Sequence, residues 1–230
     1  MGERPLHSPS PMSKLHHYFL EPMNTLTHLM GAVASLAGTL ILGYLTRQQP
    51  GKFVTMLVYG LSMTILYVSS SLLHGIKTDD AKRMWLNRLD HIAIFLLIAG
   101  TYTPIAYNLF PARVSWPALV FIWVAVIMGA LYKLFSPRIH GWVNASIYVF
   151  LGWGSAVPLL LSTNLLAISP PGGLALLLFG GLIYTMGFFI YYFRWPDPWP
   201  DFFGHHEIWH IFVMGGSLCH FLFILFFVVP

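Results

Sequence analysis

Charged residues are scarce in this sequence of 230 residues. Only 9% of the residues are Asp, Glu, Lys or Arg, whereas 57% are hydrophobic. A water-soluble domain carries about 25% charged residues, so most of this chain is not suited to a surface that faces water. The composition therefore predicts an integral membrane protein that is surrounded by the lipid bilayer.

Cysteine is also nearly absent, because the chain contains only Cys219. One cysteine excludes an intramolecular disulfide framework, and its apolar neighbours indicate packing as a small hydrophobic residue. No apolar core of a signal peptide occurs in residues 1–23, which contain prolines and scattered charges. The basic residues are spread between apolar runs and form no patch, which argues against a nucleic-acid partner.

Long apolar runs dominate the rest of the chain. A transmembrane helix needs about 20 such residues, and seven runs of that length can be placed. Because the connecting segments are short, neighbouring helices should be antiparallel in one all-α bundle. We therefore predict a tail over residues 1–23 and one transmembrane domain over residues 24–230. The predicted spans are Thr27–Thr46, Phe53–His74, Leu89–Phe110, Ser115–Leu134, Trp142–Thr163, Gly173–Arg194 and Ile208–Val229.

The lysines and arginines between these spans predict the orientation. Cytoplasmic loops carry an excess of these residues, and a cytoplasmic N-terminus places nine of the 12 basic residues on the inner side. The outer side then holds only Arg47, Lys52 and Arg113. The pattern favours a cytoplasmic N-terminus and an external C-terminus.

The last apolar run opens with His206-Glu207-Ile208-Trp209-His210. Two histidines four positions apart share one face of a helix, at a spacing that suits two zinc ligands. His74 ends the second span at the same membrane face and would supply a third nitrogen, leaving a fourth position open for water. Histidines that bond loop carbonyls are the alternative to a metal site.

The same five residues also match the H-E-x-x-H pattern, in which the glutamate can act as a general base. Glu207 is therefore a possible base. An intramembrane protease would need a further ligand downstream, where only Cys219 and His220 follow. Because the third ligand is better found upstream, at His74, the pattern does not favour a protease.

Asp90 and Ser70 are the candidate catalytic residues beside this metal site. An ionisable side chain at a helix mouth in lipid should face the bundle and be paired, so Asp90 is expected to accept from a zinc-activated water or to orient a histidine. A helix cap or an ion pair with Arg88 is the alternative. Ser70 lies one turn deeper than His74, where it could instead bond back to a carbonyl of its own helix.

Glu21, Asn24 and His28 share one face of the first helix, at its cytoplasmic end. They are expected to support the metal ligands or control substrate entry, with interhelical packing bonds as the alternative. His91 and His220 are expected to make structural hydrogen bonds. By helix rise, His220 lies about 15 Å deeper than His210 and cannot share its metal.

An ordered set of motifs resembles the hemolysin III family, the bacterial branch of the progestin and adipoQ receptor superfamily, which is itself similar to the alkaline ceramidases. The motifs are Glu21-Pro22-Met23-Asn24 with Thr27-His28, Ser70-Ser71-Leu72-Leu73-His74, Arg88-Leu89-Asp90-His91, Ala99-Gly100-Thr101-Tyr102-Thr103-Pro104, His206-Glu207-Ile208-Trp209-His210 and Ser217-Leu218-Cys219-His220-Phe221.

The resemblance implies seven transmembrane helices in a bacterial inner membrane and a zinc ion held by His74, His206 and His210. It also implies that Ser70 and Asp90 hold or polarise the zinc water. In the family, the residue after the first histidine of the pair need not be glutamate, so Glu207 is not the shared base.

These observations favour a zinc-dependent hydrolase of lipid amides or esters that acts in membrane lipid homeostasis. The apolar interior of the bundle would take the acyl chain. One alternative is a non-enzymatic sensor of lipid or of membrane state, in which zinc only braces two helices. The family name suggests cytolysis through a pore, but no polar stripe along the helices would line a water channel.

Overall fold

The structure is a computed structural model that describes residues 11–135, 146–154, 170–200 and 202–230. Within these ranges the chain is almost entirely helical, and an isolated bridge between Trp199 and Phe203 is the only β structure. A short helix precedes six helices that are long and apolar enough to cross a membrane. The bounds are α1 Pro11–Tyr18, α2 Pro22–Thr46, α3 Pro50–Gly75, α4 Asp80–Leu109, α5 Ala112–Phe135, α8 Pro171–Phe193 and α9 His205–Phe227.

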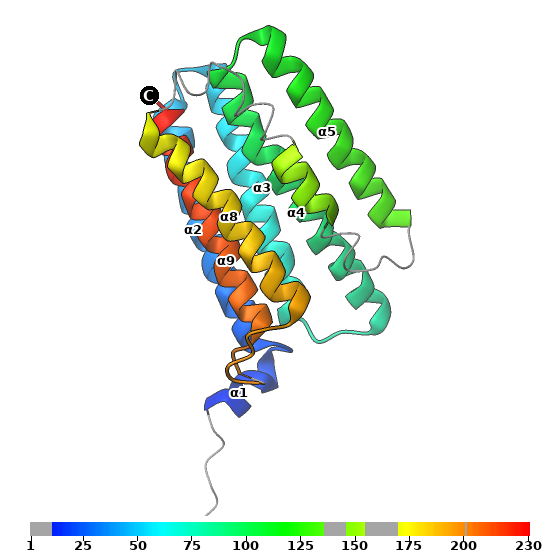
Figure 1. Cartoon of the computed structure of the whole chain (residues 1–230). Coiled ribbons are helices and arrows are strands. Elements are labelled where there is room, and N and C mark those ends of the chain that lie inside the picture. Colours follow the sequence, from blue (N-terminus) through cyan, green and yellow to red (C-terminus); the bar gives the residue numbers. More distant parts are fainter. Residues whose placement is uncertain (1–10, 136–145, 155–169, 201) are drawn as a thin grey trace, which may run out of the picture.

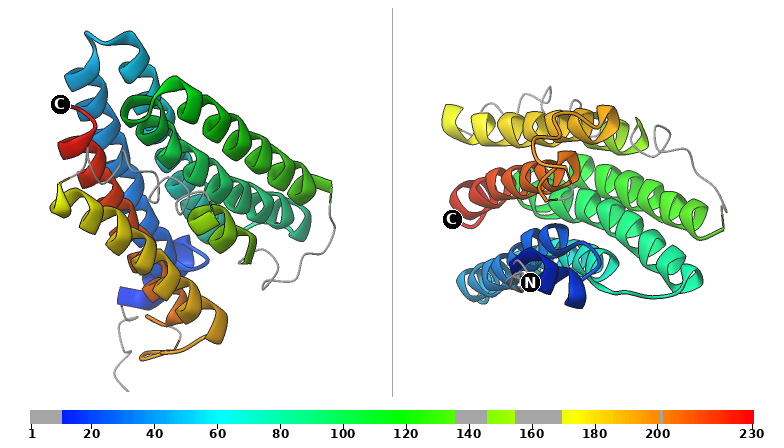
Figure 2. Two further views of the ribbon diagram at one scale, coloured as in Figure 1. Left: turned by 45° about the horizontal axis from the view of Figure 1, so that its top comes forward. Right: turned by 90° about the horizontal axis from the view of Figure 1, so that it is seen from below.

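The six long helices form one bundle (Figure 1). α2 packs on both α3 and α9, and α8 packs on α9 at one side of the bundle (Figure 2). α4 packs on α3, and α5 packs on α4 at the opposite edge. The short α1 lies below the end of the bundle where α9 begins (Figure 1). The multi-pass all-α membrane protein expected from the composition is confirmed.

The number of spans stays partly a prediction. Six of the seven predicted spans correspond to α2, α3, α4, α5, α8 and α9. The predicted span Trp142–Thr163 lies largely outside the described residues, although residues 146–154 within it are helical. The first ten residues of the predicted tail also lie outside the described part.

Several helices begin earlier than their apolar runs. α2, α3 and α8 each start at a proline, whose fixed φ and missing N–H suit the first helical position. α4 starts at Asp80, more than two turns before the predicted Leu89, because Asp79 caps its N-terminus by accepting a hydrogen bond from the Lys82 N–H at 2.9 Å. Asp90 therefore lies inside α4, and its interpretation as a helix cap is wrong.

The packing shows which surfaces face lipid. Buried apolar side chains such as Leu42, Met56 and Tyr59 join α2 and α3 in a core that continues onto α9. Many large apolar residues are exposed on the outside of the bundle, as expected for contact with acyl chains. Close approach of α8 and α9 requires small residues: a Cβ at Gly180 would lie 2.6 Å from the His220 ring.

Candidate metal centre and cavity

Three histidines meet at one end of the bundle. His74 lies in the last turn of α3, while His206 and His210 lie in the first turns of α9. Their candidate ligand nitrogens all lie within 4.8 Å of one another, and we call these three residues the histidine triad. His74 and His210 are buried and His206 is half-buried. Three imidazoles converging in an apolar bundle form a donor set that suits zinc.

Glu21 fixes the orientation of His74. The Glu21 N–H donates to the His74 carbonyl at 2.9 Å, which sets the start of α2 beside the end of α3. The Glu21 carboxylate then accepts from His74 Nδ1 at 2.6 Å. Because Nδ1 carries the proton of this bond, Nε2 is the nitrogen left for a metal.

Glu21 is itself held from two further sides. Asn24 Nδ2 donates to Glu21 Oε2 at 3.0 Å, and the Arg83 guanidinium donates to Oε1 at 3.3 Å. The hydrogen bond from His74 is the main cause that lowers the pKa of Glu21 to about 2, against the opposing effect of burial. The carboxylate is therefore ionised at neutral pH and supports the imidazole with a full negative charge.

Thr27 fixes the orientation of His210 in the same way. Its Oγ1 lies 3.1 Å from His210 Nδ1 and 3.0 Å from the carbonyl oxygens of both Met23 and Asn24. The hydroxyl proton goes to a carbonyl, which can only accept, so Oγ1 accepts from His210 Nδ1–H. Nε2 of His210 is again the free nitrogen. The sequence analysis did not single out Thr27 for this role.

His28 stacks on the triad from α2. Its ring lies parallel to that of His210, with 3.5 Å between the centroids and an interplanar angle of 12°. Tyr67 packs against the His28 ring in a T-shaped arrangement, with 5.1 Å between the ring centroids. Glu21, Asn24 and His28, which share one helix face in the sequence, thus all lie at the triad end of α2.

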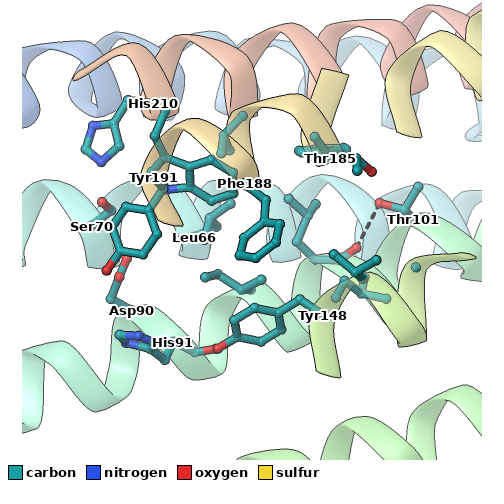
Figure 3. A pocket seen from close by; sticks show the side chains of 18 of the residues that line it. Leu66, Ser70, Asp90, His91, Thr101, Tyr148, Thr185, Phe188, Tyr191 and His210 are labelled. Atoms are coloured by element: carbon teal, nitrogen blue, oxygen red, sulfur yellow. Dashed lines mark hydrogen bonds between the residues drawn. The ribbon is translucent and has the colours of Figure 1, made fainter. Parts of the chain in front are cut away.

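Ser70 and Asp90 face each other beside the triad (Figure 3). Ser70 is buried on α3 one turn before His74, and the Asp90 side chain reaches toward it from α4. No ion pair joins Asp90 to Arg88 among the described residues, since the Arg88 guanidinium stacks over Trp85. Ser70 and Asp90 thus both face the space beside the triad.

The triad, Ser70 and Asp90 line one cavity of about 470 Å³. Its walls come from α3, α4, α8, α9 and residues 146–154, with His28 added from α2. Polar groups cluster at the triad end, and the middle is lined by apolar side chains such as Leu66, Leu97 and Phe188. In Figure 3, His210, Ser70 and Asp90 lie at one end, and Thr101 and Thr185 toward the other.

Glu207 makes a helix-capping contact, which differs from the role of a general base that its motif suggests. Its Oε2 accepts from the Gly204 backbone N–H at 2.8 Å, a contact that caps the start of α9. Glu207 is absent from the lining of the cavity formed by the described residues. The structure therefore gives it a role in starting α9.

The other singled-out histidines make structural bonds. Nδ1 of His91 lies 2.7 Å from the Asn87 carbonyl one turn earlier in α4, and His220 Nε2 lies 3.3 Å from the Leu177 carbonyl of α8. Sequence reasoning missed Tyr191, whose ring packs edge-on against His206 at 5.5 Å. An aromatic residue in a strongly apolar helix carries no signal that distinguishes this contact from ordinary core packing.

The chain also resembles known proteins along nearly its whole length. Residues 16–221 match the family described as Haemolysin-III related. The chain is 35% identical to Hemolysin-3 of Bacillus cereus over 223 residues, which cover 95% of this chain and 97% of that protein. It is 32% identical to the Hemolysin-3 homolog of Bacillus subtilis, with 91% and 94% covered.

A more distant relative is the human Monocyte to macrophage differentiation factor, a protein of the progestin and adipoQ receptor superfamily. It is 25% identical over 210 residues, which cover 86% of this chain and 80% of that protein. The family match and the two bacterial relatives each extend over nearly the whole chain. The chain therefore belongs to the Haemolysin-III related family of multi-pass membrane proteins.

Proposed function

We propose that this protein is a zinc-dependent hydrolase of lipid amides or esters, with its site at the cytoplasmic side of a bacterial inner membrane. The observation that carries the proposal is the convergence of the histidine triad with Ser70 and Asp90 on one cavity. Support of His74 by Glu21 and of His210 by Thr27 favours a built metal site over an accidental cluster.

His74, His206 and His210 would hold the metal through ring nitrogens. Zinc, when bound, polarises a carbonyl oxygen and lowers the pKa of a water molecule. Neutral imidazoles suit this ion, and the Nδ1 bonds of His74 and His210 leave their Nε2 atoms unprotonated for it.

Asp90 would take the proton of the attacking water and later return it to the leaving group. Ser70, which faces Asp90, would hold the carboxylate in place through its hydroxyl. When the carbonyl oxygen gains negative charge, the same hydroxyl would donate a hydrogen bond to it. The apolar middle of the cavity would take the acyl chain, and its volume of about 470 Å³ lies within the usual range for ligand pockets.

The first test measures metal and turnover on the same samples. Purified wild type should carry about one zinc per chain by mass spectrometry, and the His206→Ala/His210→Ala double variant should carry none. His205→Ala is the matched control, because His205 adjoins the triad but lies 3.7 Å from Asp197 instead. A metal-free wild type that takes up no added zinc would refute the hydrolase.

Turnover separates an enzyme from a lipid sensor with a structural metal. Ceramides, phospholipids and fatty amides should be screened with wild type and Asp90→Asn, which keeps the shape of the side chain but removes the base. The hydrolase predicts product formation that Asp90→Asn lowers at least 100-fold while zinc stays bound. Bound zinc that only raises thermal stability, with no product from any lipid, would favour the sensor.

A further inference from the structure

A second polar cluster lies deep in the bundle, away from the triad. It consists of Tyr67 on α3, Tyr184 on α8, and Ser217 and His220 on α9, and we call it the inner cluster. His220 follows His210 by ten residues of the same helix, so the two lie about 15 Å apart along its axis. Tyr184 and His220 both line the cavity that also holds the triad.

The three hydroxyls of the inner cluster have one proton more than they use. Tyr67 donates to Ser217 Oγ at 2.7 Å, and Ser217 Oγ lies 2.8 Å from the Tyr184 hydroxyl. Only one proton can lie between Ser217 and Tyr184, so one of the two keeps an O–H for another partner. Among the described residues, no acceptor takes this proton.

His220 has a hydrogen-bond acceptor that lacks a donor. Its Nε2 lies 3.3 Å from the Leu177 carbonyl, which only accepts, so Nε2 carries the ring proton. Nδ1 of the neutral ring is then an acceptor, and it is buried with no hydrogen-bond partner in the described part of the chain. The ring is held against α8, because Gly180 leaves the space that it fills. An unmatched acceptor in an apolar bundle is costly to keep.

One spare donor, on Tyr184 or Ser217, and one spare acceptor, His220 Nδ1, are the complement of a hydroxyl group. The rings of Tyr184 and His220 are neighbours, with 5.6 Å between their centroids. We propose that the inner cluster is a subsite for a hydroxyl carried midway along the apolar chain of a lipid ligand. The hydroxyl would accept from Tyr184 or Ser217 and donate to His220 Nδ1.

The position of the subsite selects the class of ligand. A chain whose carbonyl lies at the triad runs past the apolar lining of the cavity before it reaches the inner cluster about 15 Å away. A hydroxyl near the head of the lipid would not reach that far. The inference rests on the proposed function only in taking the cavity as the chamber for the acyl chain, and it requires neither metal nor hydrolysis.

Competition binding with two matched fatty acids tests the subsite. Oleic and ricinoleic acid share their chain, except that ricinoleic acid carries a mid-chain hydroxyl. Detergent-solubilised protein is loaded with tritiated oleic acid, and each unlabelled acid displaces it in a scintillation proximity assay. Wild type should need roughly tenfold less ricinoleic than oleic acid, the effect of a hydrogen bond made in a buried site.

Two variants should abolish this preference while still binding oleic acid. His220→Phe keeps an aromatic ring but removes both nitrogens, Nδ1 and the Nε2 that bonds the Leu177 carbonyl, and Tyr184→Phe removes only a hydroxyl. Tyr102→Phe is the matched control, because Tyr102 also lines the cavity but donates to the Gly152 carbonyl. It should keep the tenfold preference. Having two variants guards against a folding defect in either one.

Equal displacement by both acids in wild type would overturn the subsite and indicate that water fills the inner cluster. A preference that survives in both His220→Phe and Tyr184→Phe would also overturn it, as would the absence of saturable oleic acid binding. The double variant His206→Ala/His210→Ala should keep the preference, because the subsite lies apart from the triad. Wild type that takes up no zinc but still selects ricinoleic acid would refute the hydrolase and leave the subsite intact.

Discussion

Replacing Glu21 by glutamine should weaken zinc binding without unfolding the protein. The carboxylate accepts three hydrogen bonds: two at Oε2, from His74 at 2.6 Å and Asn24 at 3.0 Å, and one at Oε1, from Arg83 at 3.3 Å. A glutamine has one acceptor oxygen and one NH₂ group. Whichever way the amide is turned, the NH₂ faces a donor, either the His74 ring or the Arg83 guanidinium.

The size of the effect follows from the loss of charge. A hydrogen bond to a charged group contributes about 1.5–3 kcal/mol and a neutral one about 0.5–1.5 kcal/mol, so the orienting bond of His74 loses about 1–1.5 kcal/mol. The Glu21 side chain is 37% exposed, and solvent screening keeps the effect at the lower end. We expect zinc affinity to fall about fivefold, somewhat less than the usual effect of outer partners of metal ligands.

The assay is competition for zinc against a fluorescent chelator of known affinity, with the melting temperature of the metal-free protein measured alongside. Glu207→Gln is the matched control, since Glu207 carries the same group next to a triad histidine but caps α9 through Gly204. Its zinc affinity should stay within about twofold of wild type, because the triad keeps all its contacts. The reasoning would be refuted if Glu21→Gln left the affinity unchanged or if both variants lost it equally.

Three further predictions follow from the same structure. Thr27→Val removes the acceptor of His210 Nδ1 and should lower zinc affinity about tenfold by the same competition assay, whereas Thr27→Ser should restore it. Gly180→Ala places a Cβ 2.6 Å from the His220 ring and should destabilise the protein by about 1–3 kcal/mol in thermal unfolding. The higher helix propensity of alanine offsets up to about 1 kcal/mol of this loss. Gly172→Ala is the control and should not destabilise the protein, because no atom lies within 4 Å of the added Cβ. Removing zinc with a chelator should lower the melting temperature of wild type. The corresponding loss in the free energy of unfolding is about 4 kcal/mol if the free zinc concentration had been 1,000 times the dissociation constant. The chelator should not change the melting temperature of a variant in which any triad histidine is alanine.

The sequence predicted the helices well where apolar composition decides them. It failed at their ends, since backbone geometry and capping determine those. The charged stretch before Leu89 is typical of a loop, yet it is the exposed start of α4 because Asp79 caps it. Pro22, Pro50 and Pro171 carried a readable signal for three other helix starts, but the predicted spans were bounded by hydropathy alone.

The sequence predicted those parts of the candidate site whose role follows from residue type and spacing, and it missed those that depend on how the helices pack. Histidines at a spacing of four, with one more at a helix end, predict a candidate metal site from residue type alone, and the structure brings these three side chains together. The support of His210 by Thr27 depends on how α2 lies against α9, and a threonine in a membrane helix usually bonds to its own backbone. The inner cluster joins three helices, so its pairings arise only from the packed bundle.

α3 and α9 approach each other near both of their ends. Histidines of both helices meet at one end, and at the other Lys52 Nζ in the first turn of α3 donates to the carbonyls of Val229 and Pro230, just beyond α9, at 3.0 and 3.1 Å. A zinc ion held by the triad would therefore give the two helices a second tie far from the first and would limit sliding of one against the other. Movement that widens the cavity would then come from α4, which packs on α3, or from α8, which packs on α9.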